Sequence, residues 1–226
     1  MTQADPDQVV ALASGGLDSS VMLVRLAEDF QGVHPIYVSC GLVWEPAEKV
    51  FLYKFISRLA NPRIREVQIL SFPTIDLYGD QWFASGQGIP GYHDPDQEWE
   101  IPGRNIILLA KVAIWAKLKG ISHIGLGSLV SNRFSDATEE FFSSAEATLS
   151  IGLGQPMKIL RPFSGMQKAD IIALGSRLPL ESTLSCADPS GEKHCGVCGK
   201  CRERIEAFAE AEVPDPTAYA GTYSKT

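Results

Sequence analysis

The stretch Ser14–Ser20, Ser-Gly-Gly-Leu-Asp-Ser-Ser, constrains the fold of this chain more than any other. The apolar run Val9–Ala13 before it predicts a buried strand, and apolar residues at helical spacing after it predict a helix. Open α/β sheets bind phosphate at such turns, because glycines let the backbone approach an anion and free N–H groups at a helix start donate to it. The stretch therefore predicts a nucleotide-phosphate site; the alternative is a turn that only caps the helix.

Two features separate this turn from other phosphate loops. No Gly-Lys-Ser/Thr follows it, as in a Walker loop, and its glycines are adjacent, unlike those of the dinucleotide fingerprint. The stretch resembles the PP-loop of the ATP pyrophosphatases, Ser-Gly-Gly-x-Asp-Ser. That resemblance implies cleavage of ATP between its α and β phosphates, with AMP placed on a substrate oxygen. A Mg²⁺ ion would neutralise the leaving pyrophosphate, and Asp18 would be its natural ligand.

Length and composition exclude several classes of protein. The chain has 226 residues, 45% hydrophobic and 21% charged, which suits one large α/β domain or such a domain with a small appendage. Its net charge of −7 disfavours a broad basic face, so direct nucleic-acid binding is not expected. No apolar run reaches the length of a membrane span, and residues 1–5 lack the features of a signal peptide. We therefore expect a cytoplasmic protein without membrane contact.

The rest of the chain alternates strand and helix patterns. Strands are expected at 9–13, 36–40, 63–69, 123–127 and 158–160, and helices at 19–30, 46–59, 105–118, 137–151, 167–174 and 202–211. Residues 1–8 are expected to fray, and Gly32 to end the first helix. The βαβαβ order predicts a parallel sheet with helices on both faces.

Residues 71–100 interrupt this alternation. Glycines, prolines and aromatic residues follow one another there without a period. A loop this long inside a compact domain is usually functional or mobile. We interpret it as a flap or lid over the substrate; the alternative is an excursion on the surface.

Three further places offer polar groups for a ligand. Arg104 and Asn105 open an apolar helix, and an arginine there could bind a phosphate or carboxylate through two hydrogen bonds. Lys168 lies in the first turn of a helix, where the dipole disfavours a cation, so a bound phosphate would explain it; the alternative is a solvated lysine. The loop Ser131–Asp136 follows a strand, which makes it either a substrate site or a capping turn.

Four late cysteines have the spacing of a metal site. Cys186, Cys195, Cys198 and Cys201 form C-x8-C-x2-C-x2-C, which predicts a structural Cys₄ zinc site; an iron–sulfur cluster is the alternative. Cys40, alone after the second strand, is expected to be a buried small hydrophobe. We expect a nucleotide-binding α/β domain over 1–180 and a zinc-binding subdomain over 181–226.

The order of these motifs resembles that of the 7-cyano-7-deazaguanine synthases (QueC/ExsB family): a PP-loop, Pro102-Gly103-Arg104-Asn105, Lys168 and the cysteines. The resemblance implies a Rossmann-like adenine nucleotide alpha hydrolase fold and a homodimer. It implies that ATP adenylates the carboxylate of 7-carboxy-7-deazaguanine, ammonia gives the amide, and a second ATP dehydrates it to the nitrile. It assigns catalysis to Asp18, Arg104 and Lys168. The residues expected at the nucleotide are Ala13, Ser14, Gly15, Gly16, Leu17, Asp18, Ser19, Ser20, Gly103, Arg104 and Asn105.

The chain departs from that family where the acceptor would bind. Family members usually carry Tyr-Gly-Gln-Arg-His after the second strand, whereas residues 40–44 here are Cys-Gly-Leu-Val-Trp. Family members also carry a polar run after the fourth strand. Here that region keeps one aromatic and one acidic residue of the run, and Phe134 and Asp136 are the substrate candidates. Three alternatives therefore stay open: a paralogue that adenylates another carboxylate on a small molecule or protein, a nucleotide-binding module without catalysis, and a tRNA-thiolating enzyme.

Overall fold

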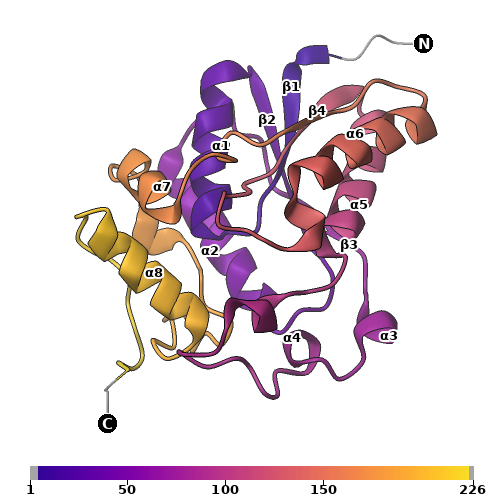
Figure 1. Ribbon diagram of the computed structural model, residues 1–226. Helices are drawn as coiled ribbons and strands as arrows, with labels where there is room; N and C mark the ends of the chain where they lie inside the picture. The colour runs from indigo at the N-terminus through magenta and orange to yellow at the C-terminus, as the bar shows by residue number, and fades with distance from the viewer. Residues whose placement is uncertain (1–4, 224–226) are drawn as a thin grey trace.

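The strands of the sheet run parallel in the order β3-β2-β1-β4-β5 (Figure 1). The computed structural model describes residues 5–223. Within them the strands are β1 (Asp5–Leu12), β2 (Gly32–Ser39), β3 (Gln68–Ser71), β4 (Ile121–Gly125) and β5 (Lys158–Leu160). The chain moves outward from β1 to β3 and then returns to β4 on the other side of β1. The carboxyl ends of β1 and β4 thus flank the point where the strand order reverses, which is where open sheets form ligand crevices.

Helices cover both faces of the sheet, as the sequence predicts (Figure 1). On one face Val112 packs in a core with Val10, and on the other Met22 and Ile171 pack with Val9. Neighbouring residues of β1 thus point to opposite cores, as a strand buried on both sides requires. The helices are α1 (Leu17–Asp29), α2 (Glu45–Leu59), α3 (Ile75–Tyr78), α4 (Trp82–Ser85), α5 (Arg104–Leu118), α6 (Glu139–Leu153), α7 (Lys168–Leu174) and α8 (Gly199–Glu210), with 3-10 turns η1 (Asp96–Trp99), η2 (Ser135–Ala137) and η3 (Leu180–Ser182).

Several expected boundaries near the N-terminus are wrong. Residues 5–8 belong to β1 and are not frayed, because the strand extends between β2 and β4. The first helix begins at Leu17, and it ends before Gly32, which is the first residue of β2. The third strand covers 68–71 and not 63–69, since Ile64 forms only one isolated bridge, to Val33. The strand at 158–160 is confirmed.

Boundaries in the second half differ for local reasons. Helix α6 begins at Glu139, because the Thr138 hydroxyl caps it by accepting the N–H of Phe141 at 3.1 Å. Helix α8 begins at Gly199 and not at 202, with Cys198 as its N-cap residue. The last two cysteines therefore belong to the start of a helix rather than to the loop before it.

Residues 71–100 contain short helices and a local aromatic core. Trp82 packs against Trp44 and Trp99, and the side chain of Phe83 is buried beneath them. The segment lies along the lower edge of the molecule in Figure 1, around α3 and α4. It is therefore a packed excursion in this structure, and its closure over a substrate stays a prediction.

The C-terminal part packs against α7 and against the turn between β1 and α1. Helix α8 lies beside α7, and the N–H of Leu184 donates to the carbonyl of Gly15 at 2.8 Å (Figure 1). The division at residue 180 stays a prediction.

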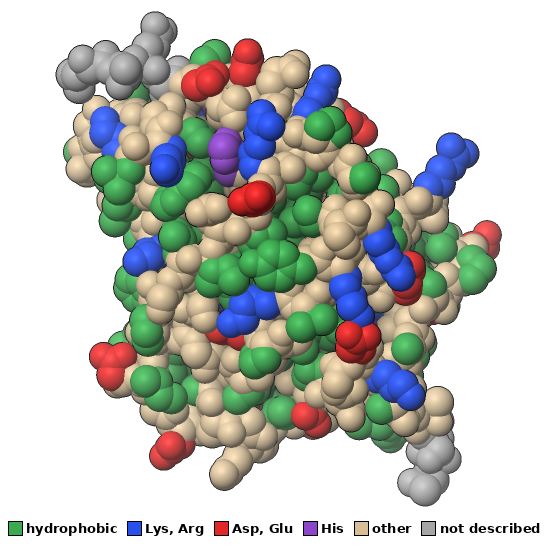
Figure 2. Space-filling model, turned by 180° about the vertical axis from the view of Figure 1, so that it is seen from behind, with side chains coloured by type: hydrophobic (Ala, Val, Ile, Leu, Met, Phe, Trp, Pro, Cys, Tyr) green, Lys and Arg blue, Asp and Glu red, His purple; other side chains and the backbone are tan. Residues whose placement is uncertain are grey.

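Seen from behind, acidic and basic side chains are interspersed over the surface of the molecule, and hydrophobic side chains gather near the middle of that face (Figure 2). Among the described residues, every helix is too short or too polar to span a bilayer.

Candidate active site and metal centre

The turn between β1 and α1 is held in place by contacts with α2. Gly15 has φ of +80°, and a Cβ atom there would lie 2.5 Å from the carbonyl oxygen of Glu48. Only glycine fits both the backbone conformation and the close approach. The hydroxyl of Ser19 accepts the N–H of Ser14 at 3.2 Å and donates to the carbonyl of Gly16 at 3.1 Å. The start of α1 is thus fixed with its free N–H groups facing the reversal point of the sheet.

A cavity of about 250 Å³ opens at that point. It brings together most of the sequence-predicted site residues: Ala13, Ser14, Gly16, Asp18, Ser19, Arg104, Asn105, Phe134 and Asp136. The cavity is not lined by four of the predicted residues, Gly15, Leu17, Ser20 and Gly103. Leu17 and Ser20 are buried residues of α1. A wider groove of about 1050 Å³ shares Asp18 and Phe134 with the cavity and is lined by Lys168, Lys200 and Arg202. Cavity and groove meet at Asp18, so two ligands could meet there.

Asp18 and Lys168 lie next to each other at this meeting point. The Nζ atom of Lys168 is 3.5 Å from Oδ2 of Asp18 and 2.6 Å from Oε1 of Glu203. Oδ1 of Asp18 is buried without a hydrogen-bond partner, and burial raises the pKa of this carboxyl, although Lys168 opposes the shift. Burial lowers the pKa of Lys168, but Asp18 and Glu203 outweigh it and raise that pKa overall. Lys168 is therefore a largely buried, paired cation rather than a solvated one.

Glu203 was not found by sequence reasoning. It lies on α8, and it also binds Lys200 at 3.1 Å. Burial alone would raise its pKa, but Lys168 and Lys200 lower the pKa of Glu203 to about 2. No sequence pattern joins α8 to α7, so only the packing of the two helices could reveal this contact.

Two buried glutamates of the cavity were also missed. Glu45 accepts hydrogen bonds from the Ser39 hydroxyl and from the N–H groups of Cys40 and Gly41. Glu48 accepts the hydroxyl of Tyr37 at 2.7 Å, and burial raises the pKa of Glu48 to about 7. Acidic residues in the first turn of a helix are common on solvated faces, because they suit the helix dipole, so the sequence offered no signal that these two are buried.

Two predicted ligand-binding residues bind each other. Oδ2 of Asp136 accepts the backbone N–H of Asn105 at 2.8 Å, and the Asn105 side chain donates to the Asp136 carbonyl at 2.9 Å. Asp136 thereby satisfies a free N–H at the start of α5. The pair positions Arg104, the first residue of that helix, at the cavity wall.

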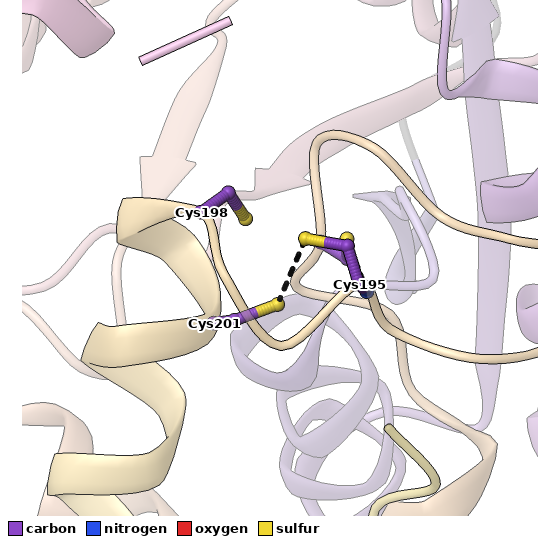
Figure 3. Close-up of side chains that lie close together, drawn as sticks. Cys195, Cys198 and Cys201 are labelled. Carbon is purple, nitrogen blue, oxygen red and sulfur yellow. Dashed lines mark hydrogen bonds between the residues drawn. The ribbon is translucent and has the colours of Figure 1, made fainter. Parts of the chain in front are cut away.

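The four late cysteines converge on one point. The Sγ atoms of Cys186, Cys195, Cys198 and Cys201 all lie within 4.8 Å of one another, and Figure 3 shows three of them turned toward a shared centre. Cys186 Sγ accepts the N–H groups of Asp188 and Cys195, and such bonds favour thiolates. Hydrogen bonds from Cys186 and Cys201 lower the pKa of Cys198. A closed set of four sulfur donors fits a structural metal ion.

A short segment joins this cluster to the phosphate turn. Leu184, whose N–H binds Gly15, lies two residues before Cys186. Arg204, on α8, has no exposed surface and donates to the carbonyl of Leu180 and to the hydroxyls of Thr183, Ser185 and Thr217. The segment that carries the cysteines and the turn between β1 and α1 are thus parts of one packed unit.

Comparison with known proteins agrees with this arrangement. The family model described as "Queuosine biosynthesis protein QueC" matches residues 8–212. The chain belongs to the QueC family. A QueC-family relative from Sulfurihydrogenibium sp. (strain YO3AOP1) is 33% identical over 90% of this chain and 95% of its own length. One from Methanothrix thermoacetophila is 32% identical over 94% of this chain and 98% of its own length. Both are named 7-cyano-7-deazaguanine synthase.

Solved structures share the fold of this QueC-family chain at low sequence identity. A predicted tRNA methyltransferase subunit from Methanocaldococcus jannaschii aligns with a TM-score of 0.50 and 17% identity, over 75% of this chain and 74% of that one. A 4-thiouridine synthetase, solved with RNA and bound ATP, aligns with a TM-score of 0.50 and 14% identity, over 94% of this chain and 47% of that one. These likenesses show the fold alone, the α/β class expected from the sequence.

Apolar side chains also lie where the family resemblance would place the acceptor. Leu42 and Trp44, which stand where the family usually has Gln and His, are each 7% exposed, and Leu42 lines the cavity. Cys40 is also buried, as expected, and burial raises the pKa of its thiol. Phe134 lines the same cavity.

Proposed function

We propose that this chain converts 7-carboxy-7-deazaguanine and ammonia to 7-cyano-7-deazaguanine at the expense of ATP, through an adenylated carboxylate. The relatives that match nearly its whole length carry the name of that synthase. The observation that carries the proposal is the cavity at the carboxyl ends of β1 and β4, which gathers the phosphate turn, Asp18 and Arg104 around one space.

The chemistry needs activation because a free carboxylate is a poor electrophile. The carboxylate oxygen attacks the α phosphorus of ATP, and pyrophosphate leaves. Ammonia then attacks the carbonyl carbon and displaces AMP, which leaves the amide. A second ATP adenylates the amide oxygen, and loss of AMP with a proton from nitrogen forms the nitrile.

The residues of the cavity suit binding and charge neutralisation. The N–H groups at the start of α1, with Ser14 and Ser19, would hold the phosphates. Arg104 would bind a phosphate or the substrate carboxylate, and the ammonium of Lys168 would stabilise negative charge on the leaving group. The orphaned Oδ1 of Asp18 and the raised pKa of this carboxyl fit a residue that holds Mg²⁺ when nucleotide is present. That ion, when bound, neutralises pyrophosphate.

We also propose that the four cysteines hold Zn²⁺, and that the ion stabilises the fold without entering the reaction, because four protein ligands fill its coordination shell. An iron–sulfur cluster is the competing occupant. Metal analysis and the absorption spectrum of the purified protein separate the two, since a cluster absorbs visible light and zinc does not.

One observation favours a second candidate function. Leu42 and Trp44 place apolar surface where the family usually has polar side chains. A paralogue that adenylates a different carboxylate, on a small molecule or a protein, would tolerate this change. A nucleotide-binding module without catalysis remains a third candidate, and a homodimer in the cytoplasm is the assembly and location we propose.

The test is pyrophosphate release with ATP, ammonia and 7-carboxy-7-deazaguanine, with the product identified by mass. Nitrile formation supports the proposed synthase. Pyrophosphate release only with another acid supports the paralogue. Binding of ATP without turnover of any acid supports the non-catalytic module.

A further inference from the structure

Four carboxylates line the cavity, and their partners differ. Both oxygens of Glu45 are occupied by the donors at residues 39–41. Asp136 accepts the N–H of Asn105, and Asp18 faces Lys168. Glu48 has a single donor, the hydroxyl of Tyr37, which binds its Oε2. Among the residues that the structure describes, no donor contacts Oε1 of Glu48.

Glu48 is 8% exposed and lines the partly open cavity beside the phosphate turn. Its Oε1 is not among the fully buried atoms without a partner, so water or a ligand in the cavity can reach it. A buried carboxylate with unused acceptor capacity is costly unless a donor reaches it. Oε1 can therefore accept N–H or O–H groups of a ligand that enters the cavity.

We infer that Glu48 is a specificity-determining residue, which accepts N–H hydrogen bonds from the donor edge of the acceptor's nucleobase. This inference rests on the proposed function and deepens it. A 7-deazaguanine presents a ring N–H and an amino group side by side, and one carboxylate can accept both. A purine-like base whose edge carries acceptors at these positions would meet the charge of Glu48 with repulsion and would be rejected.

ATP fits this position less well. Its phosphates are anionic and are repelled by Glu48, and its adenine offers a single exocyclic amino donor. The apolar surface of Leu42 lies on the same cavity wall, and a flat heterocycle can pack against it. The acceptor base is therefore the ligand that matches both the charge and the apolar surface.

The charge of Glu48 should give base binding a pH dependence. The groups that face it are Tyr37 on β2, Arg104 on α5, and Glu45 and Lys49 on its own helix. Burial raises its pKa to about 7, and Arg104 opposes that shift. The carboxylate accepts donors only above this pKa, so affinity for the base should fall as the pH drops from 8 to 6.

The decisive experiment titrates 7-carboxy-7-deazaguanine, and separately magnesium-ATP, into three proteins by calorimetry. These are the wild type, Glu48→Gln, and Glu140→Gln as a control for loss of one exposed negative charge on α6. We expect Glu48→Gln to bind the base about 10–100-fold more weakly and to bind ATP within about twofold of the wild type. Glu140→Gln should match the wild type for both ligands.

Equal base affinity in the wild type and Glu48→Gln would overturn the inference, and so would a parallel loss of ATP affinity. If Glu48→Gln does not fold, the wild type alone decides: base affinity should fall about tenfold from pH 8 to pH 6, and an unchanged affinity overturns the inference. Failure of the proposed function has a separate readout. Base binding that depends on Glu48 without nitrile formation would end the synthase proposal and keep the inference, whereas a wild type that does not bind the base ends the inference.

Discussion

At the phosphate end of the cavity, the side-chain hydrogen bonds of the turn join residues within Ser14–Ser19. At the acceptor end, they join β2 to α2 through Tyr37 and Glu48, and α5 to η2 through Asn105 and Asp136. The first end carries the local motif that predicted it, whereas at the second end Leu42 and Trp44 stand where the family resemblance predicts polar side chains. A site made by one local segment can be predicted from its spacing, whereas a site assembled from distant segments depends on tertiary packing.

The largest expected effect concerns the phosphate end. Asp18→Ala should lower turnover by about 1000-fold or more, because its carboxylate is the proposed Mg²⁺ ligand. Its melting temperature should not fall, since a buried carboxyl with an unpartnered oxygen is removed. Pyrophosphate release and thermal unfolding measure the two quantities, with exposed Asp76→Ala as the control. Turnover near the wild-type rate would show that the motif does not serve catalysis here.

The next effect concerns the cysteine cluster, on which both ends depend. Cys198→Ser should lose the metal and about 3–4 kcal/mol of stability, because three ligands hold the ion weakly. Metal content and thermal unfolding check this, and Cys40→Ser, outside the cluster, should keep its full metal content. A Cys198→Ser variant with the metal content and the melting temperature of the wild type would contradict the proposed metal site.

The third prediction concerns Lys168, which lies beside Asp18 where the cavity meets the wider groove. Lys168→Gln should lower kcat/KM for ATP about 100-fold, because it removes the cation beside Asp18 and leaves Glu203 without its closest partner. Steady-state kinetics at varied ATP measures the loss. The exposed Lys193→Gln serves as the control. A selective loss of affinity for the acceptor, with ATP unaffected, would place Lys168 at the other end of the cavity.

The smallest effect concerns the acceptor end and stability alone. The pKa of Glu48 is about 7 in the folded chain and near its ordinary value of 4.5 when unfolded, so folding binds a proton between these values. Stability is therefore lost as the pH rises from 4.5 through 7. Glu48→Gln should gain about 1–2 kcal/mol over the wild type at pH 8 and nothing at pH 4. Chemical denaturation at the two pH values measures the difference, and a gain of equal size at both would exclude a titration effect.

The same comparison explains what could be predicted from the sequence. The phosphate turn, the cysteine cluster and the alternation of strands and helices depend on local spacing, and the structure has them. The third strand was misplaced, because pairing with β2, rather than β-propensity, decides which residues form it. Glu48 and Glu203 were missed because each contacts a residue of another element, Tyr37 on β2 and Lys168 on α7, to which no sequence pattern connects it. Asp136 and Asn105 were both predicted as ligand-binding residues, but the hydrogen bonds between them were not.

The hydrogen bond from Leu184 to Gly15 has a consequence for biosynthesis of the chain itself. About three quarters of the polypeptide separates these two residues, so the turn between β1 and α1 gains this partner only late in synthesis. Such long-range closure slows folding. A nascent chain that stalls before the cysteines would therefore expose an unfinished phosphate turn to chaperones and proteases.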